Sequence, residues 1–334
     1  MTTIGSPMLW TITITVVLAL LALDFVLTRR PHAVSMKEAL GWSAFYLALP
    51  LAFGGWVLAT HGSERGLEYY TGYLVEKSLS VDNLFVFMLL LAAFAVPDEL
   101  KQRVLLYGIV GALVLRGIFI ALGAAALSAF DAVFLVFGLI LVGTAVKILR
   151  DALSGADHAV DVDGLTTVRW IRRFLPVTEE YAGPRITIRE AGRRALTPFG
   201  VVVIAVFATD VVFAVDSVPA VYGITSDPYL VFVTNAFALL GLRALYFVLE
   251  GALGSLRYLG HGLAAILAFI GAKLVVHWAH LRWESVPEIP TLLSLGVVVG
   301  ILVVTVLASI VANRRGAGSA DRLDESSAVE LENR

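Results

Sequence analysis

The chain has 334 residues, of which 58% are hydrophobic and only 16% are charged, and its formal net charge is −2. Soluble domains carry about 45–50% apolar and about 25% charged residues, so this surplus of apolar residues points to a lipid environment. The near-neutral charge gives no reason to expect a nucleic-acid partner. Because the chain has no cysteine, disulfides, thiolate zinc sites and thiol catalysis are excluded.

The first apolar run, from Met8 to Thr28, is long enough to cross a bilayer, since a spanning helix needs about 20 residues. A cleavable signal peptide begins with positive charge. Here the first cations, Arg29 and Arg30, come after the apolar run. We therefore expect this segment to be retained as the first span.

Apolar runs of spanning length, each ended by charge, glycine or proline, recur along the chain. The predicted spans are 8–28, 38–59, 69–96, 103–125, 131–150, 197–222, 229–252, 258–280 and 291–312. They predict an all-α, polytopic bundle of about nine transmembrane helices within residues 1–312, with 8–59 as peripheral spans. We expect the polar segment 151–196 to be a cytoplasmic loop and residues 313–334 to be a disordered cytoplasmic tail.

The distribution of lysine and arginine predicts the orientation of the bundle, because cytoplasmic loops carry the excess of these residues. The cation-rich connections fall on one side only if the number of spans is odd. They are 29–37, 101–103, 147–194, 257 and 314–315. We therefore expect a multi-pass membrane protein with the amino terminus outside and the carboxyl terminus in the cytoplasm.

An internal repeat relates the third and sixth predicted spans. Glu76 and Asp82 enclose five residues, as do Asp210 and Asp216, and in both segments the second acid follows valine and precedes a small polar residue. The pairs are followed by a second match, in which Leu-Arg116 corresponds to Leu-Arg243. Each unit has three spans, in 69–150 and in 197–280. An odd number of crossings makes the two units opposite in topology, as in many secondary transporters.

The four repeated acids would be costly at membrane depth, at about 2.5–3.5 kcal/mol each. In an antiparallel pair of helices the midpoints of the two acid pairs lie at the same depth. Glu76 is then expected to lie level with Asp216, and Asp82 level with Asp210, in two acidic layers. Only bound cations or paired arginines would make such layers tolerable, so we take the four acids as candidate metal ligands.

A spacing of six residues does not place both acids of a pair on one face of an intact helix. We expect a break in each helix to reconcile this, and Pro219 supplies a cause because its ring frees the carbonyl of Val215. Freed carbonyls and carboxylates are hard ligands that suit manganese, magnesium or calcium. Asn83 and Ser217 are candidate auxiliary ligands on the same path.

Two arginines, Arg116 and Arg243, lie within spans at matching repeat positions. Either they neutralise the acids as structural ion pairs, or each pairs with a carboxylate when the transported cation leaves. Acids that are locked by guanidinium groups, with no room for an ion, would count against transport. We expect no permanent cofactor and no enzyme, because the chain has neither a Gly-rich phosphate loop nor a nucleophile constellation.

The segments Glu76-Lys-Ser-Leu-Ser-Val-Asp82-Asn83 and Asp210-Val-Val-Phe-Ala-Val-Asp216-Ser217-Val-Pro219 resemble the TerC/Alx family of bacterial membrane proteins. The resemblance extends from about residue 10 to 312. The family is named for tellurite resistance, is implicated in manganese export and in supplying metal to exported proteins, and is grouped with the LysE superfamily. The resemblance therefore implies manganese as the cargo and the four acids as its path, whereas the residues alone indicate a hard divalent cation.

Three hypotheses follow from these observations. The first is efflux of manganese, with exchange against protons at the same carboxylates. The second is a membrane scaffold that recruits soluble stress or secretion proteins through the loop 151–196. The third is transport of an oxyanion by Arg116 and Arg243, which the excess of buried acids makes unfavourable. The expected partners are a divalent metal ion and the lipid bilayer, with other membrane or secretion proteins under the second hypothesis.

Overall fold

The computed structural model describes residues 3–27, 35–154, 176–178, 180–190, 193–250, 258–283 and 285–332. Within these ranges, the side chains of Leu27, Asp82, Phe85, Ser154, Glu190, Arg193 and 313–332 lie outside the description. Its described helices and strands are α1 (Pro7–Leu27), α2 (Met36–Ala93), α3 (Asp98–Ala129), α4 (Ala132–Ser154), β1 (Thr187–Glu190), β2 (Arg193–Leu196), α6 (Pro198–Tyr222), α7 (Pro228–Leu240), α8 (Leu242–Glu250), α9 (Leu259–His280) and α10 (Thr291–Glu332). The prediction of an all-α polytopic membrane protein is confirmed. Six described helices are long and apolar enough to cross a membrane, or seven if the bent pair α7–α8 is one span.

Helix α2 contains two of the predicted spans, 38–59 and 69–96, on two arms that meet at Gly62. Gly62 has φ 87° and ψ 173°, a conformation that glycine adopts without steric cost. The arms then pack against each other, because Tyr69 donates to the carbonyl of Pro50 at 3.0 Å and Tyr70 to that of Leu51 at 2.8 Å. The nine-span count itself stays a prediction.

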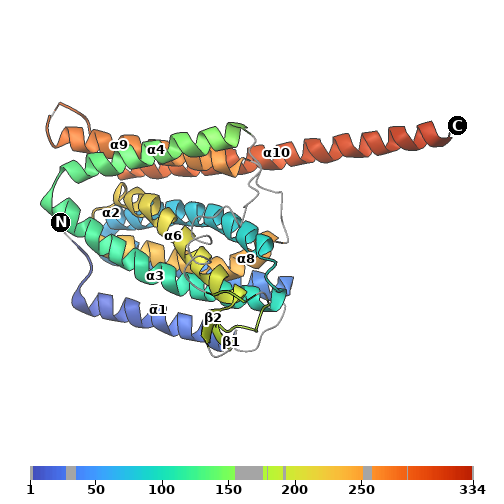
Figure 1. Cartoon of the computed structure of the whole chain (residues 1–334). Coiled ribbons are helices and arrows are strands. Elements are labelled where there is room, and N and C mark those ends of the chain that lie inside the picture. Colours follow the sequence, from blue (N-terminus) through green and yellow to red (C-terminus); the bar gives the residue numbers. More distant parts are fainter. Residues whose placement is uncertain are drawn as a thin grey trace.

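The helices pack in layers around the centre of the bundle (Figure 1). Helix α4 packs along α9, which also contacts α10, while α3 packs on α6 and α2 on α6, α7 and α8. Helix α1 contacts α3 and α7 on the opposite side of the molecule from α4. Helices α2, α3, α6 and α7 therefore surround the region in which the candidate site lies.

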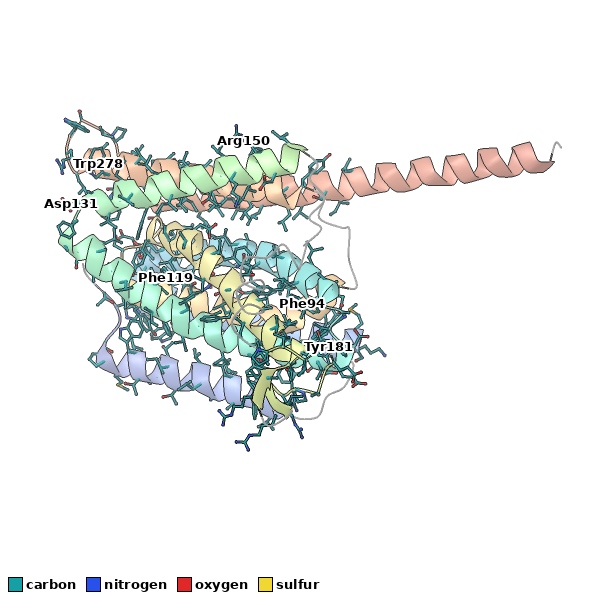
Figure 2. The ribbon with its side chains drawn as sticks, in the orientation of Figure 1. Phe94, Phe119, Asp131, Arg150, Tyr181 and Trp278 are labelled. Atoms are coloured by element: carbon teal, nitrogen blue, oxygen red, sulfur yellow. The ribbon has the colours of Figure 1, made fainter. Side chains whose placement is uncertain are left out.

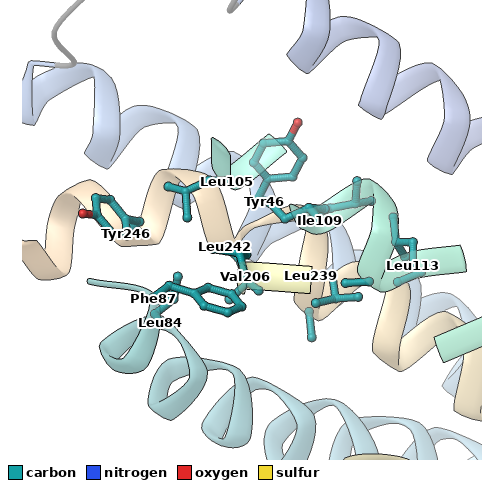
Figure 3. Close-up of a cluster of buried hydrophobic side chains, with 14 of the residues drawn as sticks. Tyr46, Leu84, Phe87, Leu105, Ile109, Leu113, Val206, Leu239, Leu242 and Tyr246 are labelled. Carbon is teal, nitrogen blue, oxygen red and sulfur yellow. The ribbon is translucent and has the colours of Figure 1, made fainter. Parts of the chain in front are cut away.

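A cluster of buried apolar side chains holds these central helices together (Figure 3). It includes Leu84 and Phe87 of α2, Ile109 of α3, Val206 of α6 and Leu239 of α7, each no more than 5% exposed. The outer faces are apolar as well, with Val114, Leu122 and Val304 each more than 60% exposed. Such a surface suits a bilayer, in which apolar side chains face lipid.

The described part of the predicted loop 151–196 includes a docked hairpin. Strands β1 and β2 pair antiparallel, and Tyr181 ahead of them donates to the carbonyl of Phe94 at 2.8 Å. Burial raises the pKa of Tyr181 to about 12, so its hydroxyl stays a donor at neutral pH. Figure 2 shows Phe94 and Tyr181 at one end of the bundle and Asp131 and Trp278 at the other. Residues 155–175 of the predicted loop lie outside the description.

The packing has the symmetry that an inverted repeat would give. Under the predicted relation, the second arm of α2 corresponds to α6, α3 to α7–α8, and α4 to α9. The observed contacts α4–α9, α2–α6 and α3–α7 each map onto themselves, and α3–α6 maps onto α2–α7. The relation itself remains a prediction.

Two glycines lie opposite each other where α4 crosses α9. A Cβ on Gly138 would meet the carbonyl oxygen of Gly271 at 2.8 Å, and a Cβ on Gly271 would meet that of Gly138 at 2.9 Å. Gly143, five residues further along α4, has open space around it. Gly138 is therefore the closer structural counterpart of Gly271.

The carboxyl-terminal tail differs from the expected disordered segment at 313–334. Helix α10 continues to Glu332 and projects beyond the other helices (Figure 1). Alanine, glutamate, arginine and leucine are frequent in this stretch. These residues have high helix propensity, which gives the helix a physical reason to continue.

We predict that Gly138→Ala weakens the contact between α4 and α9. The new methyl group would press on a backbone oxygen that has no room to move, and overpacking of this kind costs about 1–3 kcal/mol. Thermal unfolding of the purified protein in detergent should show a lower midpoint. The matched control is Gly143→Ala, on the same helix but in open space. If both variants unfold at the same temperature, the contact does not limit stability.

Candidate functional site

A buried arginine connects the two halves of the predicted repeat. Arg116 of α3 donates through Nη1 to Glu76 of α2 and, at 2.9 Å, to Asn235 of α7. Its Nη2 donates to Asp210 of α6 at 3.2 Å. All four residues are at most 1% exposed. One guanidinium thus joins four helices, with a carboxylate from each half of the molecule.

The second oxygen of each carboxylate, Glu76 Oε2 and Asp210 Oδ2, is buried and has no hydrogen-bond partner among the described residues. Arg116 Nε is also buried without a described partner, as are the hydroxyls of Ser80 on α2 and Ser217 on α6. Leaving a buried polar atom unsatisfied costs about 1–3 kcal/mol, and more for a charged group. Carboxylate and hydroxyl oxygens are the ligands that hard divalent cations prefer. Arg116 therefore satisfies only half of each carboxylate, and the other half can accept a ligand.

The structure changes the predicted pairing of the acids. Glu76 was expected to lie with Asp216, yet it shares Arg116 with Asp210. Asp216 is only partly buried on α6. Asp82 lies in α2, but its side chain is outside the described residues. Among the side chains that are described, no three acids or histidines lie close enough to hold a metal.

The predicted helix breaks are not present in the described backbone. Helix α6 is continuous from Pro198 to Tyr222 and includes Pro219. Pro219 lies in its last turn, where Gly223 donates back to its carbonyl at 2.9 Å, so the helix ends within a turn of the lost donor. In an intact helix six residues turn through about 600°. Asp216 therefore points away from Asp210, which explains why one is buried and the other is partly exposed.

Arg243 lies in a separate network instead of with the four acids. It donates to Asp24 of α1 at 2.8 Å and to Gln102 of α3 at 3.1 Å. Tyr46 of α2 also donates to Asp24, at 2.8 Å. Asp24 is 1% exposed, although it lies near the end of the first predicted span. The charge of Arg243 is balanced by Asp24, a residue outside the predicted repeat.

A cavity of about 800 Å³ opens at the end of the bundle beyond Asp216. Glu68, on its wall, accepts hydrogen bonds from Arg65 and Thr225, each at 2.8 Å. His277 contacts Glu288 at 3.0 Å across the same cavity. His277 and His280 have the spacing of a zinc fragment, but His280 contacts the carbonyl of Val286 at 2.6 Å. The two histidines therefore secure the loop between α9 and α10.

A family model described as the integral membrane protein TerC family matches residues 61–317, which include every residue of the Arg116 centre. The chain belongs to the TerC family. It is 42% identical over 318 residues to a Salmonella typhi protein named "Putative membrane-bound redox modulator Alx", with 92% of this chain and 95% of the relative covered. It is 40% identical over 319 residues to an uncharacterized membrane protein of Myxococcus xanthus, covering 95% and 96% of the two chains. No solved structure matches the chain.

One residue of the Arg116 centre was missed in the sequence as a site residue. It is Asn235, in the apolar run of α7. A polar amide inside a spanning segment is itself a signal, because such groups need a partner away from water.

We predict that Asp24→Asn destabilises this TerC-family protein without affecting the Arg116 centre. The change removes the negative charge facing the Arg243 guanidinium, and breaking a buried ion pair costs about 3–5 kcal/mol. Unfolding in detergent measures the loss, with Glu99→Gln at an exposed position as the control. Cation binding by the folded variant should be unchanged. A variant that is fully stable but does not bind cations would place Asp24 in the site.

Proposed function

We propose that the chain is a transporter that exports a hard divalent cation, with manganese as the expected substrate. One observation carries the proposal. Glu76 and Asp210, from opposite halves of the molecule, meet in the buried centre, and one oxygen of each lacks a partner among the described residues. Buried acids in a membrane protein mark ion pathways, because they are too costly to keep without a function.

The charges around Arg116 favour a cation over an anion. Two buried carboxylates face one guanidinium, so this group of three carries one excess negative charge before Asp82 and Asp216 are considered. An oxyanion would have to displace both carboxylates from Arg116 and then lie among them, which is electrostatically unfavourable. A divalent cation would instead find ligands of the charge and hardness it prefers.

Arg116 fits the role of a counterion that pairs with the carboxylates when the cation has left. It contacts one oxygen of Glu76 and one of Asp210, and in the described part of the chain the other oxygen of each acid has no partner. Removing a cation from an otherwise unpaired pair of buried acids would leave both charges uncompensated. A tethered guanidinium avoids that state and makes release of the cation less costly.

Manganese and the outward direction come from the family resemblance, not from the geometry of the centre. The relatives named "Putative membrane-bound redox modulator Alx" suggest an effect on redox state. This chain has no cysteine, so its own residues cannot perform thiol–disulfide exchange. A change in the available pool of a transition-metal cation would be an indirect route to such an effect.

We predict that Glu76→Gln and Asp210→Asn abolish cation flux into liposomes that contain the purified protein. Each change removes one of the two carboxylates that contact Arg116. Loss of a charged ligand costs about 3 kcal/mol of binding free energy, which lowers the affinity for the cation by more than about 100-fold. Manganese, magnesium, calcium and zinc are compared across a pH gradient, which also tests exchange against protons. The matched control is Glu99→Gln, which removes an exposed carboxylate.

Flux that survives in both acid variants would contradict the proposal. If the acid variants function in cells, and a variant with residues 155–175 replaced by a Gly-Ser linker does not, the result supports the scaffold hypothesis. Cells that lack the protein provide the background for this comparison.

We also propose that the protein lies in the bacterial cytoplasmic membrane with its amino terminus outside. The cysteine-free sequence allows a direct test with single introduced cysteines. A membrane-impermeant thiol reagent should label Ser63→Cys, at the cavity end, in intact cells, because this end is predicted to face outward. Arg189→Cys, in the hairpin at the other end, should react only after lysis. The reverse pattern would invert the proposed orientation.

A further inference from the structure

Two asparagines contact Arg116 from different helices in a matching way. Asn235 of α7 accepts from Arg116 Nη1 at 2.9 Å, while its own amide nitrogen donates to the carbonyl of Val231 at 3.1 Å. Asn83 of α2, in the amide orientation that gives both ends a partner, accepts from Arg116 Nη2 at 3.3 Å and donates to the carbonyl of Leu79 at 3.1 Å. Each amide is thus tied to the carbonyl four residues earlier in its own helix.

These backbone hydrogen bonds fix which atom of each amide faces the arginine. Rotating either amide would break its bond to the helix and turn an NH₂ group toward a cation. Both side chains are buried, at 4% exposure for Asn83 and 1% for Asn235. Each terminal nitrogen of Arg116 therefore has one fixed neutral acceptor and one carboxylate: Asn235 with Glu76, and Asn83 with Asp210.

We propose that Asn83 and Asn235 form a neutral clamp that keeps the Arg116 guanidinium in the site while Glu76 and Asp210 pass between the arginine and the cation. This inference rests on the proposed cation transport. When a cation takes the carboxylates, the guanidinium needs other acceptors, because a buried charge without hydrogen bonds is very costly. The two amide oxygens supply them. Asn83 is then a positioning residue for Arg116 and not the metal ligand that the sequence suggested.

The clamp matters more in the cation-bound state than in the empty one. In the empty state Arg116 has two carboxylates and two amides, so losing one amide leaves three acceptors. In the cation-bound state the amides are its remaining partners in this group. Removing one of them should therefore weaken cation binding by about tenfold, the value of one hydrogen bond to a charged group.

The test is the equilibrium affinity of purified protein for Mn²⁺, followed by the electron paramagnetic resonance signal of the free ion. Asn235→Leu and Asn83→Leu should each raise the Kd by about tenfold. In an Arg116→Gln background the same leucine substitutions should change the Kd no further, because the clamp then holds nothing. Gln102→Leu is the matched control, since it removes an amide acceptor from the other buried arginine, Arg243, and should leave the Kd unchanged.

A second variant covers the case in which the leucine substitutions disturb folding. Asn235→Asp keeps the size and polarity of the side chain and gives Arg116 a permanent carboxylate partner. Glu76 and Asp210 are then released to the cation, so the Kd should fall by about tenfold, a direction that a folding defect does not produce.

The clamp is overturned if the leucine substitutions leave the Kd unchanged, or if they weaken binding equally with and without Arg116. A Kd that stays the same or rises in Asn235→Asp also overturns it. Failure of the proposed function looks different, since the wild-type protein would then bind and transport no divalent cation. That result would overturn both proposals, whereas normal wild-type transport with unaffected asparagine variants would overturn the clamp alone.

Discussion

The arrangement of the central helices depends on the burial of the Arg116 guanidinium away from water. A charge in this environment requires partners with good geometry, and the chain supplies them from α2, α6 and α7. The apolar contacts around Leu84, Val206 and Leu239 tolerate small shifts of one helix along another, as apolar packing in lipid has little directionality. Hydrogen bonds between specific atoms do not. The ion network therefore fixes the register in which the acids meet.

The two arginines at matching repeat positions have different surroundings, which explains a role for the peripheral helix α1. Arg116 pairs with acids of both halves, while Arg243 pairs with Asp24 of α1. If Arg243 also faced the acids, two guanidinium groups would neutralise Glu76 and Asp210 and leave less negative charge for a cation. Arg243 instead lies in the Asp24 network, so its charge does not reduce the excess of acid in the centre. Helix α1 thus balances the charge of Arg243 outside the Arg116 centre.

Much of this architecture could be predicted from the sequence, because spanning helices and intramembrane charges are visible in the order of residues. The acids, Arg116 and the spanning segments followed from apolar periodicity and the cost of buried charge. The partners could not be predicted in the same way. Whether Glu76 meets Asp210 or Asp216 depends on the rotation of α2 against α6, and the expected breaks concealed the 600° turn that separates Asp210 from Asp216. The pairing of Asp24 with Arg243 could not be predicted either, because no local signal links two residues more than 200 positions apart in the chain.

The difference between the two arginine networks also indicates which of them binds a ligand. Around Arg243, the described buried atoms without a partner include only its own Nε, and Asp24 accepts from both Tyr46 and Arg243. At Arg116, one oxygen of Glu76 and one of Asp210 lack a partner among the described residues, as does the Nε of Arg116 itself. A buried polar network that serves stability alone is normally satisfied throughout, since each orphan atom reduces the gain from the rest. The orphan oxygens near Arg116 are therefore better explained by a ligand that comes and goes than by packing, and the single carboxylate contact on each side of the guanidinium is what leaves them available.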